Sequence, residues 1–475
     1  MDQQKDQQQF QTLLDRALTD NVAWCRGVES VERLSGGASQ ETYRLVVRTE
    51  GGERPMALRR APGGIGKEET IGPGPGLATE AALMQAAQAA GVPEPEVYYV
   101  LQPEDGLGEG FAMQWFDGEA LGAKIARAPE YESLRGGLAY ECGKILARIH
   151  SVDLDATGLR EQLDTFSPLE LMRNSWERYQ AYPTPQPMID YTARWLQDNP
   201  PEHYDNALVH NDFRNGNFMV DERDVIAVLD WEVAHIGDPM RDLGWICTNS
   251  WRFGRTEHPV GGFGEYADLF RGYEEESGKA VDPAHVRYWE VNGSFWWAVG
   301  CLGMAEHYRH GPDQTVERPG IGRRSSECQI DCVNMLIPGP VELVEGIDLD
   351  ASSEMPRLNE LLISVRDFLR EDVMGATAGR TNFLARVAGN SLDIVLRDLA
   401  MGEQARALEH ERLRGLLGAQ GSLDDLRWQL VHGLRDGSIA LDNEALQTHL
   451  RLTVANQVAI DQPRYSGLRT ALEVS

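Results

Sequence analysis

The sequence predicts an α+β fold made of two lobes, followed by an all-helical bundle domain. Apolar and polar residues alternate between residues 28 and 60, which is typical of a small antiparallel sheet. Helical periodicity dominates from residue 131 onward. With 475 residues the chain is too long for one ordinary domain. We therefore divide it into a sheet lobe (1–118), a mostly helical lobe (119–345) and a C-terminal helical domain (355–475).

The first part is predicted to be a sheet with one inserted helix. A short amphipathic helix is expected over residues 10–26, before the alternating segment that ends in PMALRRAP. The Gly- and Pro-rich segment GGIGKEETIGPGPG predicts a loop. A helix over residues 78–90 then ends at Gly91. The segments EVYYVL and GFAMQWF supply two more strands.

The second part is predicted to be mostly helical, with helices over residues 131–150, 168–199 and 263–337. Between them, ALV and VIAVLDW are short apolar runs that predict two strands, and a polar cluster follows each run. The longest apolar stretch, SFWWAVGCLGMA, has about a dozen residues, whereas a membrane span needs roughly 20. We therefore expect it to form a buried helix.

The third part follows a Pro- and Gly-containing stretch at residues 337–356. Residues 356–375 place apolar side chains on one stripe of a helix. Further helices fit residues 382–400, 403–417, 422–435 and 443–459. Because such stripes can bury a core of their own, we expect a chain shortened to end near Gly346 to stay soluble. His432 and His449 are expected at solvent-facing helix positions.

Composition excludes several classes of partner. The formal net charge is -29, so nucleic acid and anionic membranes are poor partners. Residues 351–475 hold 14 Arg and 17 Asp and Glu, so the acidity lies mainly before them. The six cysteines show no CxxC spacing, which favours free thiols in a reducing, cytoplasmic compartment. The first residues have no apolar region, so we expect no secretion signal.

The two polar clusters carry the chemistry. His210, Asn211 and Asp212 follow the first predicted strand, and Asn217 lies five residues after Asp212. Asp230 ends the next strand. In protein kinases an Asp and an Asn at this spacing accept the substrate's proton and hold magnesium, while a later Asp holds the metal at the phosphates. Hard oxygens suit Mg²⁺.

These residues belong to a longer pattern. The chain reads HNDFRNGN, then VLDWE, then GDPMRDLGW, which resembles the aminoglycoside phosphotransferase family, a branch of the protein-kinase-like fold. Asn211 stands where that family usually has Gly. The resemblance implies that Asp212 is the catalytic base and that Asn217 and Asp230 bind magnesium. It also implies an orienting role for His210, and structural roles for Asp238 and Asp242.

The resemblance implies an ATP site in the first lobe. Gly36, Gly37 and Ser39 would cover the phosphates. Arg59 stands where the family has Lys, with Glu80 as its partner, and Arg can hold phosphate or carboxylate in two-point contacts. The segment resembling the hinge, where the backbone meets adenine, consists of Gln114, Trp115 and Phe116.

The acceptor is left open. GGASQETYRL and MALRRAP look most like the kinase-like domains related to those fused to acyl-CoA dehydrogenases, which implies a hydroxyacyl-CoA or similar metabolite as the hydroxyl substrate. An antibiotic kinase and a non-catalytic nucleotide-binding protein are the alternatives. Five arginines lie in the helical region expected to receive the acceptor: Arg252, Arg255, Arg309, Arg323 and Arg324. For the C-terminal domain, we expect docking of a second copy or of a metabolic enzyme.

Overall fold

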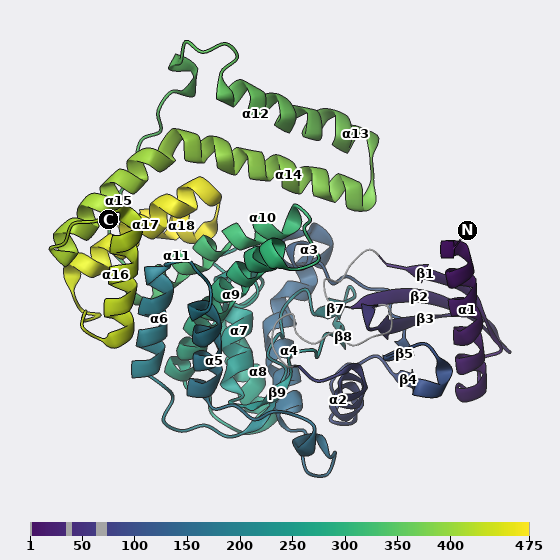
Figure 1. Cartoon of the computed structure of the whole chain (residues 1–475). Helices are drawn as coiled ribbons and strands as arrows, with labels where there is room; N and C mark the ends of the chain where they lie inside the picture. The colour runs from purple at the N-terminus through teal and green to yellow at the C-terminus, as the bar shows by residue number, and fades with distance from the viewer. Residues whose placement is uncertain (1, 35–39, 63–73, 475) are drawn as a thin grey trace.

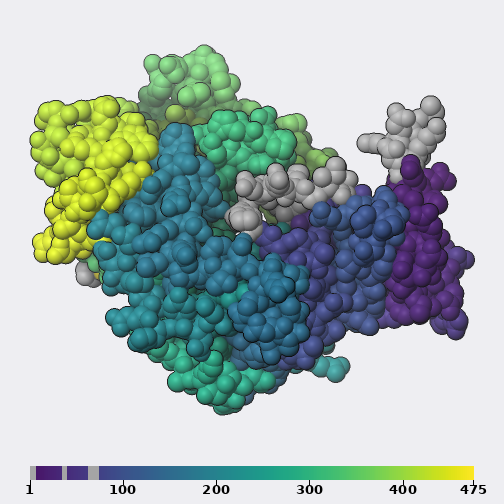
Figure 2. Space-filling model, turned by 60° about the horizontal axis from the view of Figure 1, so that its bottom comes forward, coloured from purple at the N-terminus to yellow at the C-terminus, as the bar shows by residue number. Residues whose placement is uncertain are grey.

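The computed structural model describes residues 2–34, 40–62 and 74–474. It confirms the predicted α+β architecture: a five-stranded antiparallel sheet, a mostly helical lobe and further helices toward the C-terminus (Figure 1). The sheet lobe (purple) and the last helices of the chain (yellow) lie at opposite ends of the molecule, with the helical lobe between them (Figure 2).

The sheet has the strand order β1-β2-β3-β5-β4. Its strands are β1 (Gly27–Arg33), β2 (Glu41–Thr49), β3 (Gly52–Arg60), β4 (Val97–Val100) and β5 (Gly110–Gln114). Helix α1 (Asp2–Asn21) packs on the sheet through Leu14 and Leu18, which are both fully buried. It begins before the predicted residue 10 and ends before residue 26. The inserted helix α2 (Leu77–Ala89) matches its prediction closely. In the strand order given above, β3 is the middle strand and lies at the centre of the sheet.

The helical lobe surrounds two small two-stranded sheets that position the polar clusters. These pair β6 (Ala207–Val209) with β9 (His235–Gly237), and β7 (Phe218–Val220) with β8 (Val225–Val228). Its helices are α3 (Gly122–Arg127), α4 (Glu132–His150), α5 (Pro168–Gln180), α6 (Pro187–Asp198), α7 (Met240–Cys247), α8 (Tyr266–Ser277), α9 (Pro283–His310), α10 (Glu317–Arg323) and α11 (Ser325–Leu336). The apolar stretch SFWWAVGCLGMA lies within α9, as expected. A membrane-crossing helix is absent from the part of the chain that the structure describes.

Two glycines allow α4 and α8 to cross closely. A Cβ atom on Gly143 would lie 2.1 Å from the carbonyl oxygen of Leu269, and one on Gly272 would lie 2.0 Å from that of Tyr140. Only glycine fits such a backbone approach. The crossing places His150, at the end of α4, beside Tyr273 of α8 with 3.0 Å between Nδ1 and the hydroxyl oxygen.

The C-terminal region is all-helical, as predicted. It contains α12 (Leu358–Asp367), a π-helical turn (Phe368–Val373), α13 (Met374–Ala376), α14 (Gly379–Arg397), a second π-helical turn (Asp398–Gly402), α15 (Glu403–Leu417), α16 (Leu423–Asp436), α17 (Glu444–Asp461) and α18 (Ser466–Glu473). The helix α18 was not predicted. Helices α12 to α14 form an arm that extends from the rest of the region (Figure 1).

The C-terminal helices share a core with the helical lobe. One buried cluster joins Tyr191 of α6 and Ile330 of α11 to Leu430 of α16 and Val458 of α17. A buried ion pair reinforces this contact: Arg435 Nε lies 2.7 Å from Oδ1 of Asp190, a carboxylate with no exposed surface. Because of this shared core, we no longer expect a chain that ends near Gly346 to stay soluble.

A chain shortened to end at Gly346 should aggregate or unfold at a clearly lower temperature than the full chain. The cut exposes the α6 and α11 side of the shared core and leaves Asp190 without its cation, and breaking a buried pair in this way costs about 3–5 kcal/mol. Size-exclusion chromatography and thermal unfolding test this. A monodisperse shortened protein with an unchanged unfolding midpoint would contradict the shared core.

His449 was expected at a solvent-facing helix position, but the structure buries it. It lies inside α17 and is 1% exposed, not on the solvent face, although His432 is exposed as expected. Neither ring nitrogen of His449 has a hydrogen-bond partner among the described residues. Burial lowers the pKa of His449 to about 3, and Arg412 and Arg427 act in the same direction. The imidazole is therefore neutral in the folded protein.

This burial predicts a pH effect on stability. Below about pH 6.5, His449 becomes protonated in the unfolded chain but stays neutral in the folded chain. The free energy of unfolding therefore decreases as the pH falls from about 6.5 toward about 3. His449→Leu should therefore lose less stability than the wild type between pH 7.5 and pH 5.5, with His432→Leu as the exposed control. Thermal unfolding midpoints measure this, and identical slopes in the wild type and His449→Leu would count against it.

Candidate active site

The polar clusters meet where the small strands end. Strand β6 ends at Val209, and the loop from His210 to Asn217 leads into β7. Strands β7 and β8 pair antiparallel, and the N–H of Leu229 donates to the carbonyl oxygen of Asn217 at 2.7 Å. This pairing brings Asp230 next to Asn217. Asn211 and Asp230 adopt left-handed backbone conformations, with φ of 67° and 72°. Strain of this kind in non-glycine residues clusters at functional sites.

Asp212 is held by donors on both carboxylate oxygens. Its Oδ1 accepts from Trp245 Nε1 at 2.7 Å and from Arg214 Nε at 3.0 Å. Its Oδ2 accepts from the side-chain amide of Asn217. Arg214 in turn lies over the ring of Trp251, 4.1 Å from its centroid. Arg214 was not predicted from the sequence, although a cation two residues after Asp212 in HNDFRNGN was a visible signal.

Asp242 anchors the loop that carries Asp212. Its carboxylate accepts the backbone N–H groups of His210 at 2.8 Å and of Asn211 at 2.7 Å, and contacts His150 Nε2 at 3.1 Å. Burial acts to raise the pKa of Asp242, but these hydrogen bonds and the neighbouring histidines outweigh it and lower the pKa. In the structure Asp242 thus ties the loop to α7. Asp238 accepts from Trp289 Nε1 at 2.7 Å and caps the N–H of Met240.

His210 is a neutral, orienting residue in this geometry. The backbone N–H of Asp212 donates to its Nδ1 at 3.2 Å, so the proton of the ring lies on Nε2, which donates to the carbonyl oxygen of Leu229 at 3.1 Å. Burial lowers the pKa of His210, which is 0% exposed. A neutral imidazole with both nitrogens engaged has no free site to act as a base.

The side chain of Asn211 explains why this position is not Gly. Its Oδ1 accepts from Arg241 Nε at 2.9 Å, and its Nδ2 donates to the carbonyl oxygen of Val233 at 3.2 Å. Arg241 is fully buried and lies over Trp245, with 4.9 Å from Cζ to the ring centroid. Burial lowers the pKa of Arg241 to about 10, so the guanidinium keeps its charge at neutral pH.

Arg59 of β3 reaches into the site from the sheet lobe. Its Nε lies 3.1 Å from Oε2 of Glu80 on α2, and its Nη2 donates to Asp230. Glu232 contributes a third carboxylate at 3.7 Å. Burial alone would lower the pKa of Arg59, but the three carboxylates outweigh it and raise it. Burial raises the pKa of Glu80 to about 7, against the opposing effect of Arg59. The predicted Arg59 and Glu80 are therefore brought together.

Asn217 and Asp230 offer hard oxygens for a metal ion. Hydrogen bonds orient the Nδ2 of Asn217 toward Asp212, and Arg59 uses only Oδ1 of Asp230. Among the described residues, Asn217 Oδ1 and Asp230 Oδ2 make no hydrogen bond. The same described residues contain no cluster of three or more His, Cys, Asp or Glu that would form a metal site on its own. This set fits Mg²⁺, which is usually bound by one or two carboxylates together with phosphate and water.

The predicted hinge begins at the end of β5. Gln114 is the last residue of the strand, and its N–H donates to the carbonyl oxygen of Glu96 at 2.8 Å. In the described parts of the chain, no backbone hydrogen bond involves Trp115 or Phe116. Their backbone groups are thus available to a ligand. Gly36, Gly37 and Ser39 lie outside the described residues.

A cavity of about 560 Å³ opens beside Asn211. Its walls include the apolar side chains of Leu163, Phe166, Leu171 and Trp296, together with Arg178 of α5. Trp296 contacts Trp245 edge-on with 4.9 Å between ring centroids, and Trp245 donates to Asp212. Trp296 in the cavity wall therefore contacts the same Trp245 that is hydrogen-bonded to Asp212.

The arginines expected near the acceptor mostly pair with local carboxylates. Ion pairs of 2.7–3.1 Å join Arg252 to Glu290, Arg255 to Glu257, Arg323 to Asp461 and Arg324 to Glu327. None of the five predicted arginines lines the cavity beside Asn211. Among the described residues, the arginine that lines this cavity is Arg178, which was not predicted from the sequence.

Two curated proteins are similar to parts of this chain. The chain is 31% identical over 218 residues to acyl-CoA dehydrogenase family member 10 of Mus musculus, which covers 44% of this chain and 19% of that protein. It is 26% identical over 451 residues to family member 11 of Gallus gallus, covering 90% of this chain and 56% of that protein. The chain thus spans about half or less of these curated relatives.

Solved structures support the fold. A candidate aminoglycoside phosphotransferase from Ralstonia eutropha superposes with a TM-score of 0.54 at 23% identity, covering 67% of this chain and 95% of that one. At the C-terminal end, residues 375–465 match a domain of unknown function (DUF6285). Residues 30–278, more than half of the chain and including His210, Asp212, Asn217 and Asp230, match the phosphotransferase enzyme family (APH). The chain therefore belongs to the phosphotransferase enzyme family.

Proposed function

We propose that the protein transfers the γ-phosphate of ATP to a hydroxyl group of a small molecule, with a hydroxyacyl-CoA or similar metabolite as the acceptor. The observation that carries this is the joint placement of Asp212, Asn217, Asp230 and Arg59 at the meeting point of the two lobes. Six free cysteines, all buried, fit the reducing cytoplasm as its location.

Asp212 is the proposed base. As the acceptor oxygen forms a bond to the γ-phosphorus, its proton passes to a carboxylate oxygen of Asp212, and the bond from that phosphorus to the bridging oxygen of ADP breaks. Trp245 and Asn217 fix the direction of the Asp212 carboxylate. Arg214 lies beside it, where its guanidinium can stabilise negative charge on the transferred group.

Arg59 is the proposed phosphate-positioning cation. Its guanidinium is kept charged by Glu80 and Asp230, and it belongs to the strand that faces the catalytic loop. When magnesium is bound, it neutralises phosphate charge and orients the γ-phosphate. Asn217 and Asp230 would hold it.

The cavity beside Asn211 favours an acyl metabolite over an aminoglycoside. Apolar and polar side chains both line it, and among the described residues its only carboxylate is Asp164, beside one arginine, Arg178. A polycationic aminoglycoside would need several carboxylates there. An apolar chain that carries a hydroxyl group and an anionic group matches these walls better.

A panel of acceptors tests this choice. With γ-labelled ATP and magnesium, label should pass to a hydroxyacyl-CoA, and transfer to kanamycin should stay at the level without acceptor. Transfer to the aminoglycoside alone would identify an antibiotic kinase. Absence of transfer to any hydroxyl compound, combined with intact ATP binding, would favour a non-catalytic nucleotide-binding protein.

Asp212→Asn should lower the rate of phosphate transfer by a factor of roughly 10²–10⁴, which is the usual effect of removing a general base. ATP affinity should change little, because the proposed contact of Asp212 is with the acceptor. Glu222→Gln, an exposed carboxylate just after β7, is the matched control. Steady-state kinetics and calorimetric ATP titration measure both quantities, and full activity of Asp212→Asn would refute the assignment.

Arg59→Ala should weaken ATP binding, and Arg59→Lys should restore part of it because the charge survives while the two-point geometry is lost. Arg60→Ala is the matched control, since Arg60 lies on the same strand but binds the Leu107 carbonyl oxygen and Glu41. Calorimetric titration gives the affinities. Equal ATP affinity in Arg59→Ala and the wild type would assign this role to another residue.

A further inference from the structure

A second cavity lies between the helical lobe and the C-terminal arm. It has a volume of about 910 Å³ and is lined by α10, the start of α11, the π-helical turn before α13, α14 and the turn after α17. It shares no lining residue with the cavity beside Asn211. Its volume falls within the range of small-molecule sites, roughly 300–1,000 Å³.

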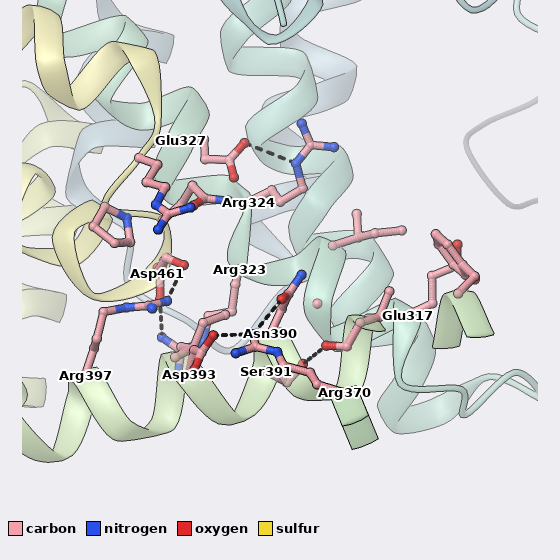
Figure 3. Close-up of a pocket in the computed structure, with 18 residues that line it drawn as sticks. Glu317, Arg323, Arg324, Glu327, Arg370, Asn390, Ser391, Asp393, Arg397 and Asp461 are labelled. Atoms are coloured by element: carbon pink, nitrogen blue, oxygen red, sulfur yellow. Dashed lines mark hydrogen bonds and ion pairs between the residues drawn. The ribbon is translucent and has the colours of Figure 1, made fainter. Parts of the chain in front are cut away.

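Arginines from both sides line this cavity. The five are Arg323, Arg324, Arg370, Arg397 and Arg464, against four carboxylates. The lining of this cavity thus has more cationic than anionic side chains, whereas the chain as a whole has a net charge of -29. Figure 3 shows Arg323 and Arg324 on one side and Asp393 and Arg397 of α14 on the other.

The four carboxylates are engaged with protein donors. Asp461 accepts from Arg323 Nη1 at 3.1 Å, Ser326 Oγ at 2.9 Å and Gln457 Nε2 at 2.9 Å. Asp393 binds Arg366 and Arg370, as Figure 3 shows for Arg370. The remaining two, Glu317 and Glu327, form ion pairs with Arg380 and Arg324. Their negative charge is therefore largely neutralised.

Guanidinium donors remain available. Arg324 binds Glu327 through Nε at 3.1 Å, and its two Nη atoms have no hydrogen bond to any described residue. Arg464 makes neither a hydrogen bond nor an ion pair within the described parts of the chain. If these arginines served only to hold the arm against the helical lobe, the Nη atoms of Arg324 and the guanidinium of Arg464 would have no need to stay without an acceptor among the described residues. An apolar wall completes the cavity: Ile321, Phe383, Val387, Ile394 and Pro463.

We propose that this cavity binds the phosphate of a small organic phosphate at a site separate from the catalytic centre. Planar guanidinium groups match phosphate oxygens in paired hydrogen bonds, and the apolar wall accommodates the organic part. The phosphate can belong to a free nucleotide or to the coenzyme of an acyl thioester, and these two sources share the recognised chemistry.

Hydrogen–deuterium exchange of the full-length protein locates the site. Coenzyme A and ADP, each without magnesium, are the two probes. The bound phosphate should slow exchange in peptides covering residues 386–397 and 461–466. Protection of these peptides by coenzyme A alone identifies a thioester coenzyme as the source, and protection by ADP alone identifies a nucleotide. Protection by neither, or only within residues 208–232, overturns the proposal.

Substitutions separate the site from the catalytic centre. Arg464→Ala and Arg324→Gln should each weaken binding of the protective probe about tenfold or more, as expected for the loss of a hydrogen bond to a charged group. Arg414→Ala is the control, because Arg414 is also exposed, has no ion pair with a described residue and does not line the cavity. Magnesium–ATP affinity should be unchanged in all three. Equal probe affinity in Arg464→Ala and the wild type contradicts the site and leaves the proposed phosphotransfer untouched.

Discussion

The contact of Arg59 with Glu80 and Asp230 is the interaction on which the proposed active site depends. It joins the central strand of the sheet lobe, the inserted helix and the segment after β8 in one partly buried ion cluster. Three carboxylates surround one guanidinium, so the carboxylates of the cluster outnumber its cation. Because β3, α2 and the loop after β8 converge here, the relative position of the two lobes and the placement of Asp230 are coupled.

A second buried anchor sets the catalytic loop. Asp242 receives two successive backbone N–H groups from that loop and a histidine from α4, so one carboxylate fixes both the strained backbone of Asn211 and the start of α7. His210, held neutral between Asp212 and Leu229, adds rigidity without adding charge. Asp212 is consequently presented on a loop whose supports are buried, while its own carboxylate stays partly accessible.

Much of the site could be predicted because its residues lie in short contiguous motifs. Asp212, Asn217 and Asp230 belong to one segment of two strands, and the pairing of Arg59 with Glu80 followed from the family resemblance. Trp245, 33 residues from Asp212, was missed because nothing local signals a hydrogen bond across that separation. His449 was misplaced because polarity predicts exposure, whereas in the structure its side chain is buried. The shared core was missed because apolar stripes on α15 to α17 do not reveal whether they face each other or α6 and α11.

We propose that Asp230 and Asn217 hold the metal at the nucleotide phosphates. Electron paramagnetic resonance of Mn²⁺, used in place of Mg²⁺ with a non-hydrolysable ATP analogue, reports on this directly. The wild type should bind Mn²⁺ in a ternary complex whose signal differs from that of the Mn²⁺–nucleotide complex in solution, and Asp230→Asn should lose that signal while Glu222→Gln keeps it. The same protein-bound Mn²⁺ signal in Asp230→Asn would contradict this metal site.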